Sequence, residues 1–325
     1  MKPRKENKSG TSQIIPTAIG PIARTVDDCV LFMKATLVPE MFLGDLNVAP
    51  IPFNNEMYER EDKLKIGYFS TDGWFEPCAT SKRAIRESID ALTAAGHTCV
   101  PFDLPTDGWF SYGLLASING AEGNFRNFTE ALEGEPLISE YLPLVLATAL
   151  PDWLRWIAIR LLDKRSAHLL GQGRSGGLKV WDLWQRTADM AEMKSKWSDA
   201  MRCQGLDVLI HPAMPLPAFQ HSLSVYLTGA CSYMFMANML LWPSGVVPVT
   251  TVRADEAHYR KEDLPENQRD SMANFAAKIM QGSEGLPICV SVTAPPFRDE
   301  TCLRAMKEVE RLVNYQGKPE AYKHV

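Results

Sequence analysis

The chain has 325 residues, of which 46% are hydrophobic and 22% charged, a composition typical of a soluble globular protein with one large domain or two. Its formal net charge of −5 excludes the basic excess that nucleic-acid-binding proteins show, so we predict no nucleic acid partner. Seven cysteines are scattered without a Cys-x-x-Cys pair and six histidines lack metal-ligand spacing, so we expect reduced thiols, no metal and no cofactor.

The first half of the chain alternates predicted strands and helices. Strands are expected over 63–69 and 97–102, with a helix over 80–95 between them and Gly96 directly after that helix. A strand, a helix and a strand of these lengths predict a parallel crossover. His97 follows the end of the helix, and we expect it on the surface.

The segment 137–162 is the most unusual stretch, and Pro143 and Pro151 break it into pieces. The helix predicted for the second piece, from 152 to 162 and onward, is apolar on nearly two sides and therefore needs two apolar neighbours. One is the protein core, and the other is a partner subunit or a bilayer surface; the alternative is a buried helix with solvated ends. Charged residues interrupt the segment, so it cannot span a membrane. The predicted membrane-contacting side chains are Trp153, Leu154, Trp156, Ile157 and Leu161. The basic side chains expected to reach lipid headgroups are Arg155, Arg160, Lys164 and Arg165.

A Gly-rich loop follows this segment. Its residues 173–177 fit the G-x-S-x-G pattern of a nucleophile, with Ser175 at the centre. A nucleophile elbow needs a preceding strand, whereas an amphipathic helical stretch precedes this loop, so a linker is the favoured interpretation. Next comes a predicted helix over 178–201, whose expected inward residues are Leu183, Trp184, Met190, Trp197 and Met201.

A short strand is expected over 206–210, followed by a Pro-rich loop over 211–217 that can border a ligand site. The stretch 233–252 then carries no charge. Its first half is rich in Met and predicts a buried helix, and its second half is β-branched and predicts a buried strand. The same methionines can also line an adaptable apolar pocket. The remaining expected elements are a helix over 271–280, a strand over 285–292 and a last helix that starts at Asp299.

Four segments together resemble the amidase-signature family. They are Gly-Pro-Ile-Ala-Arg-Thr-Val-Asp-Asp at 20–28, Leu-Asp-Val-Leu-Ile-His-Pro at 206–212, Pro-Ser-Gly-Val-Val-Pro-Val at 243–249 and Gly-Leu-Pro at 285–287. Within that family, the fatty acid amide hydrolases are the most similar group. Three segments resemble sequence motifs of that group: Ala-Ala-Gly-His-Thr at 94–98, Gly-Val-Val-Pro-Val-Thr-Thr-Val at 245–252 and Met-Lys-Glu-Val-Glu-Arg-Leu at 306–312.

The resemblance implies an α/β fold, a mixed β-sheet sandwiched by helices, that is incomplete at the N-terminal side. Residues 1–325 are then the C-terminal part of one domain, and 150–177 form a membrane-facing cap insertion and loop. The implied activity is hydrolysis of linear amides of long-chain fatty acids, such as N-acylethanolamines and primary fatty acid amides, in lipid metabolism. In the family a Ser-Ser-Lys triad cleaves the amide.

The sequence contains no Gly-Gly-Ser-Ser-Gly-Gly signature, so we assign no catalytic residue. We therefore expect the chain alone to be inactive, because a hydroxyl needs a positioned base to attack an amide. Such a chain would be a fragment, an alternative product or a truncated gene product. The resemblance implies a substrate channel lined by Tyr233, Met234, Met236, Met239, Trp242 and Met272, although the relatives carry Trp at the position of Met272. It also implies an intracellular protein that binds peripherally to endomembranes and takes a lipid-like amide as its partner. A homodimer is one possible oligomeric state. The alternatives are a non-catalytic membrane-associated or partner-binding homologue and, less well matched to the apolar cap, an amidotransferase subunit.

Overall fold

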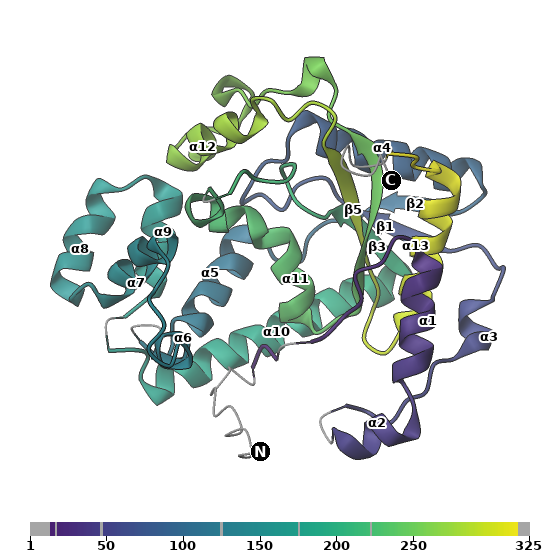
Figure 1. Cartoon of the computed structure of the whole chain (residues 1–325), viewed down its shortest axis with the longest axis horizontal. Coiled ribbons are helices and arrows are strands. Elements are labelled where there is room, and N and C mark those ends of the chain that lie inside the picture. The colour runs from purple at the N-terminus through teal and green to yellow at the C-terminus, as the bar shows by residue number, and fades with distance from the viewer. Residues whose placement is uncertain are drawn as a thin grey trace.

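A five-stranded mixed sheet lies at the centre of the structure, which is a computed structural model (Figure 1). The structure describes residues 14–16, 18–45, 48–123, 126–174, 176–221 and 223–317. The strands are β1 (Lys65–Tyr68), β2 (Thr98–Pro101), β3 (Val208–Pro212), β4 (Ser244–Thr251) and β5 (Pro287–Thr293). Their order is β2-β1-β3-β5-β4, so β4 is an edge strand. β1 is parallel to β2 and β3, whereas β5 is antiparallel to β3 and β4, which confirms the predicted mixed α/β sheet and the parallel crossover.

Helices cover both faces of this sheet. They are α1 (Val26–Thr36), α2 (Pro39–Gly44), α3 (Asn55–Tyr58), α4 (Ala79–Ala94), α5 (Gly108–Asn119), α6 (Arg126–Ala131), α7 (Leu142–Ala149), α8 (Asp152–Leu161), α9 (Lys164–Gln172), α10 (Val180–Gln204), α11 (Ser232–Leu240), α12 (Ser271–Met280) and α13 (Asp299–Val313). Five 3-10 turns are η1 (Ser139–Tyr141), η2 (Ser224–Cys231), η3 (Ala254–Glu256), η4 (Lys261–Asp263) and η5 (Glu266–Gln268). α4 and α13 pack on each other and on the sheet, while α5, α10 and α11 lie on the other side (Figure 1).

β3 begins and ends two residues later than its sequence pattern predicts. All five of its residues are buried, as expected for a strand covered on both faces. His211 and Pro212, which we expected to begin a loop, remain in the strand because they pair with Ser291 and Val290 of β5. The strand therefore places the His211 imidazole in the buried core at the centre of the sheet.

His97 is buried, contrary to the expectation that it lies on the surface. Gly96 has a φ of +91° and turns the chain back after α4, as its position after the helix predicts. The turn brings the His97 ring under β1, where the backbone N–H of Leu64 donates to Nδ1 at 3.0 Å. Nε2 lies 3.4 Å from the carboxylate of Glu308 on α13. A long-range partner therefore decides where this side chain lies.

α10 begins outside the core and ends inside it. Met190, Trp197 and Met201 are buried, as predicted, but Trp184 is 63% exposed. A helix of 25 residues is about 37 Å long, and the buried residues of α10 all lie from Met190 onward. Its first turns therefore project beyond the core, and the prediction that Trp184 points inward was wrong.

Candidate functional site

The residues predicted to line an acyl channel lie mostly in a buried wall around α11. Tyr233, Met236 and Met239 are buried on that helix, and Met234 is 52% exposed. Trp242 is also buried, with its ring centroid 6.5 Å from that of Trp197 in an edge-on contact. The helix thus divides the predicted set into an inward group and one outward methionine.

Met272 belongs to a neighbouring part of the same wall. It is buried on α12, and its sulfur would lie 3.2 Å from a Cβ added at Gly229 of η2. The indole Nε1 of Trp74 donates to the Gly229 carbonyl at 3.0 Å and would lie 3.1 Å from the same added Cβ, so a side chain at Gly229 would crowd both neighbours. Met272 therefore packs against η2, the segment that leads into α11.

Tyr233 and Met236 line a small cavity of about 20 Å³. A space of that size holds about one water molecule. Asp72 lies at its side, and its carboxylate accepts from the backbone N–H groups of Trp74 at 2.9 Å and Phe75 at 3.0 Å, and from the Ser232 hydroxyl. Burial raises the pKa of Asp72, because the ionised form loses water. These hydrogen bonds satisfy the Asp72 carboxylate, order the turn at 72–75 and tie it to Ser232, the first residue of α11.

A second exposed feature is the apolar surface of α7 and α8, which lie far from the sheet (Figure 1). The predicted contact residues Trp153, Trp156, Ile157 and Leu161 are 68%, 60%, 41% and 82% exposed. Leu154 is half-buried. Further exposed apolar side chains lie on the preceding segment and on α7, namely Ile138, Leu142 and Leu146. We call the residues of this surface on α7 and α8 (Leu142, Leu146, Trp153, Trp156, Ile157, Leu161) the cap surface.

Two of the four basic residues expected to reach headgroups point inward instead. Arg155 is buried and donates to the carbonyl oxygens of Leu170 at 3.0 Å, Thr148 at 3.2 Å and Leu150 at 3.3 Å, so it joins α7, α8 and α9. Arg165 is also fully buried and forms an ion pair with Asp270. The prediction was wrong for both, because helical periodicity does not reveal which cation has a buried partner.

The other two basic residues remain at the surface. Arg160 and Lys164 are exposed. The Arg160 guanidinium carbon lies 3.3 Å from the centroid of the Trp156 ring, a cation–π contact beside the apolar face. The cap surface therefore combines large apolar side chains with a basic margin.

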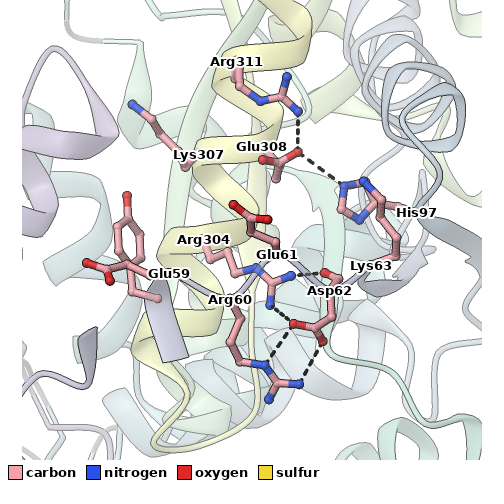
Figure 2. Close-up of a pocket in the computed structure, with 11 residues that line it drawn as sticks. Glu59, Arg60, Glu61, Asp62, Lys63, His97, Arg304, Lys307, Glu308 and Arg311 are labelled. Carbon is pink, nitrogen blue, oxygen red and sulfur yellow. Dashed lines mark hydrogen bonds and ion pairs between the residues drawn. The ribbon is translucent and has the colours of Figure 1, made fainter. Parts of the chain in front are cut away.

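A larger cavity lies elsewhere, between the connection into β1 and α13 (Figure 2). It has a volume of about 420 Å³. Its lining residues are Tyr58, Glu59, Arg60, Glu61, Asp62, Lys63, His97, Arg304, Lys307, Glu308 and Arg311. Arg304 pairs with Asp62 at 3.2 Å and Arg311 with Glu308 at 2.7 Å, so much of its charge is neutralised within the cavity. Such a lining does not suit an acyl chain.

The sequence offers Ser175 in the Gly-rich loop as a candidate nucleophile. Ser175 lies outside the described residues. The element before the loop is α9, a helix, rather than the strand that a nucleophile elbow needs.

Comparisons with known proteins decide the family. The profile of the Amidase family matches residues 6–303. The chain belongs to the amidase family. It is 35% identical over 307 residues to fatty-acid amide hydrolase 1 of Sus scrofa, covering 92% of this chain and 51% of that protein. It is 30% identical over 298 residues to fatty acid amide hydrolase 1 of Caenorhabditis elegans, covering 90% and 50%. This amidase chain thus spans about half the length of the curated relatives that it matches.

Solved structures give the same fold. A structure of fatty acid amide hydrolase aligns with a TM-score of 0.74 at 18% identity, covering 95% of this amidase chain and 50% of that chain. A bacterial aryl acylamidase of the amidase-signature family aligns with a TM-score of 0.52 at 17% identity, covering 90% and 52%. The sheet and its flanking helices are therefore those of the amidase-signature fold.

Sequence reasoning missed one polar cluster inside the sheet. It consists of His211 on β3, Ser291 and Thr293 on β5, and Ser244 on β4. A signal was available, because Ser291 and Thr293 are two residues apart in an otherwise apolar strand and hence share one face. The cluster was missed because a buried strand is recognised by its apolar residues, and the polar residues of β5 were not considered separately.

Proposed function

We propose that this chain is the lipid-facing part of a serine amidase that hydrolyses amides of long-chain fatty acids, such as N-acylethanolamines and primary fatty acid amides. Membership of the amidase family and similarity to two fatty acid amide hydrolases support the reaction class. The single observation that carries the lipid part is the cap surface, where Trp153, Trp156 and Leu161 are each more than half exposed.

Exposing such residues together is costly in water. Large contiguous apolar patches on soluble proteins mark interaction sites or membrane contacts. A helix with Trp, Leu and Ile on one face and Arg or Lys at its margin is suited to the interface of a bilayer. α8 has this composition, and Arg160 and Lys164 supply the margin. We therefore propose a peripheral contact with endomembranes through 150–162.

The described residues include no helix that is both long and apolar enough to cross a bilayer. The buried wall of Tyr233, Met236 and Met239 supports a second element of the proposal, a hydrophobic backing for the acyl group. Met234 is the member of the predicted set that a ligand can reach without rearrangement, since it is half exposed.

We further propose that the 325 residues do not hydrolyse amides by themselves. A serine hydroxyl attacks an amide only when a positioned base activates it. The sequence holds no Gly-Gly-Ser-Ser-Gly-Gly signature to supply the Ser-Ser-Lys groups.

The proposal is tested by adding a long-chain primary fatty amide, or acetamide as the short-chain control, to the purified chain and measuring binding and ammonia release. We expect saturable binding of the long-chain amide, no comparable binding of acetamide, and no ammonia from either. Equal binding of the two amides would contradict the lipid assignment. Turnover that is lost on Ser175→Ala would instead assign the reaction to the loop at 173–177.

A further inference from the structure

A chain of hydrogen bonds runs through the sheet from a buried imidazole to an exposed hydroxyl. His211 Nε2 lies 3.0 Å from Thr293 Oγ1, and Thr293 Oγ1 lies 2.8 Å from Ser244 Oγ. Ser244 Oγ also lies 3.0 Å from Ser291 Oγ. His211, Thr293 and Ser291 are buried, whereas Ser244 is exposed on the edge strand β4. The strand register places these side chains on one face of the sheet.

The direction of each hydrogen bond follows from its partners. His211 Nδ1 lies 2.9 Å from the carbonyl oxygen of Pro212, which can only accept, so Nδ1 carries the hydrogen. In the neutral ring Nε2 is then an acceptor, and the Thr293 hydroxyl must donate to it. With its hydrogen used, Thr293 accepts from the Ser244 hydroxyl. The Ser244 proton therefore points toward a hydroxyl whose own proton points toward an imidazole lone pair.

The surroundings keep that imidazole neutral. Burial lowers the pKa of His211 to about 4, because the charged ring loses its water. The ring of Phe69 stacks on it with centroids 5.0 Å apart and planes 6° apart. At neutral pH the Nε2 lone pair is thus available, although such a base is weak.

We propose that Ser244 is a nucleophile that accepts acyl groups from activated esters, while Thr293 relays its proton to His211. In this step the Ser244 Oγ–acyl carbon bond forms and the bond from that carbon to the leaving oxygen breaks. The leaving oxygen departs with the bonding electron pair and takes up the proton that Ser244 lost and His211 releases, so the sum is serine plus aryl ester giving acyl-serine plus phenol. A weak base restricts the reaction to esters with good leaving groups, and amides are not substrates of this site.

The open edge of β4 gives the developing oxyanion a place to bind. Ala294 N–H donates to the Pro243 carbonyl at 3.0 Å, so the hydrogen-bonded pairs of this ladder include Gly245 rather than Ser244. The backbone N–H groups of Ser244 and Val246 consequently point away from β5. Donors at such a position stabilise the charge that forms on an attacked carbonyl oxygen.

The test is acetylation of the purified 325-residue chain by p-nitrophenyl acetate, followed by intact mass and peptide mapping after an acid quench. We expect acetyl at Ser244 and none at this peptide in Ser244→Ala. Thr293→Val removes the relay and should slow acetylation of Ser244 by about tenfold or more. Thr293→Ser keeps the hydroxyl and should restore the rate, which separates loss of the relay from a folding defect.

Ser291→Ala is the matched control, because Ser291 donates to Ser244 but is not on the path to His211. The Ser291→Ala variant should be acetylated at Ser244 at close to the wild-type rate. Absence of acetyl at Ser244, or equal rates for Thr293→Val and wild type, would overturn the proposal. No fatty amide enters this experiment, so its outcome is independent of the proposed amidase function.

Discussion

At the scale of single residues, burial sets the chemistry of this chain more than local sequence does. His97 and His211 both follow apolar runs, yet each is held by a partner distant in sequence, Glu308 for the first and Thr293 for the second. Neither partner can be read from helical or strand periodicity. The residues that periodicity predicted well, such as Met190 and Trp197, are buried by contacts with several apolar neighbours, so no single partner has to be identified.

The buried imidazole predicts a pH dependence of stability. The pKa of His211 is about 4 in the folded chain and about 6.5 when exposed, so the unfolded state binds the proton more readily between these values. Stability is therefore lost as pH falls from about 6.5 to about 4, by about 3 kcal/mol.

The variant His211→Gln lacks the titrating group. We expect its unfolding temperature, measured at one scan rate, to approach that of wild type as the pH falls through this range. A difference between the two proteins that stays constant from pH 7 to about pH 4 would contradict the assignment.

At the scale of elements, the cap helices were located correctly from the sequence and their orientation was only partly predicted. Pro143 and Pro151 divide the segment as expected, and α8 runs from Asp152 to Leu161. Its tryptophans are exposed, whereas Arg155 turns inward and donates to three backbone carbonyl oxygens. The positions of backbone carbonyl acceptors at the ends of neighbouring helices cannot be predicted from the residue types in the sequence.

The ion pair between Arg165 on α9 and Asp270 before α12 should anchor the cap to the body of the chain. Arg165 also donates to the carbonyl oxygens of Trp74 and Gln268, each at 3.2 Å. Arg165→Met leaves the buried carboxylate unpaired, which costs about 3–5 kcal/mol.

Combining Arg165→Met with Asp270→Asn should recover much of this loss, because the amide oxygen of Asn still caps α12 where Asp270 now accepts from Ala273 N–H at 3.1 Å. Urea unfolding followed by tryptophan fluorescence would measure both variants. A double variant as unstable as Arg165→Met alone would show that the pair is not the anchor.

At the scale of the whole molecule, the sheet and the family could be predicted from the sequence, whereas the cavities could not. Segments such as 243–249 and 285–287 carried the resemblance, and they became the antiparallel β4 and β5 at one side of the sheet. The predicted channel residues gathered near α11, but the space that Tyr233 and Met236 leave is about 20 Å³. Cavity volume depends on the packing of many side chains, which no local pattern specifies.

The edge position of β4 predicts marginal stability for the isolated chain. β4 is an edge strand with eight residues, and its Val246 is 56% exposed. Unpaired backbone groups and exposed apolar side chains on such a strand favour association with other chains. We expect a broad thermal transition accompanied by aggregation, measured by circular dichroism and light scattering. A sharp, reversible transition of a monodisperse sample would count against this prediction.

Lipid contact through the cap surface is the central claim, and sedimentation with anionic vesicles tests it most directly. Wild type should sediment with the vesicles, and Trp153→Glu combined with Ile157→Glu should remain in solution with unchanged circular dichroism. Each large apolar side chain contributes about 1.5–3 kcal/mol and each basic residue about 1 kcal/mol, so high salt should weaken binding without abolishing it. The control is Trp181→Glu with Trp184→Glu, which alters two tryptophans of α10 that are 66% and 63% exposed and should sediment like wild type. Equal sedimentation of wild type and the Trp153/Ile157 variant would contradict the account.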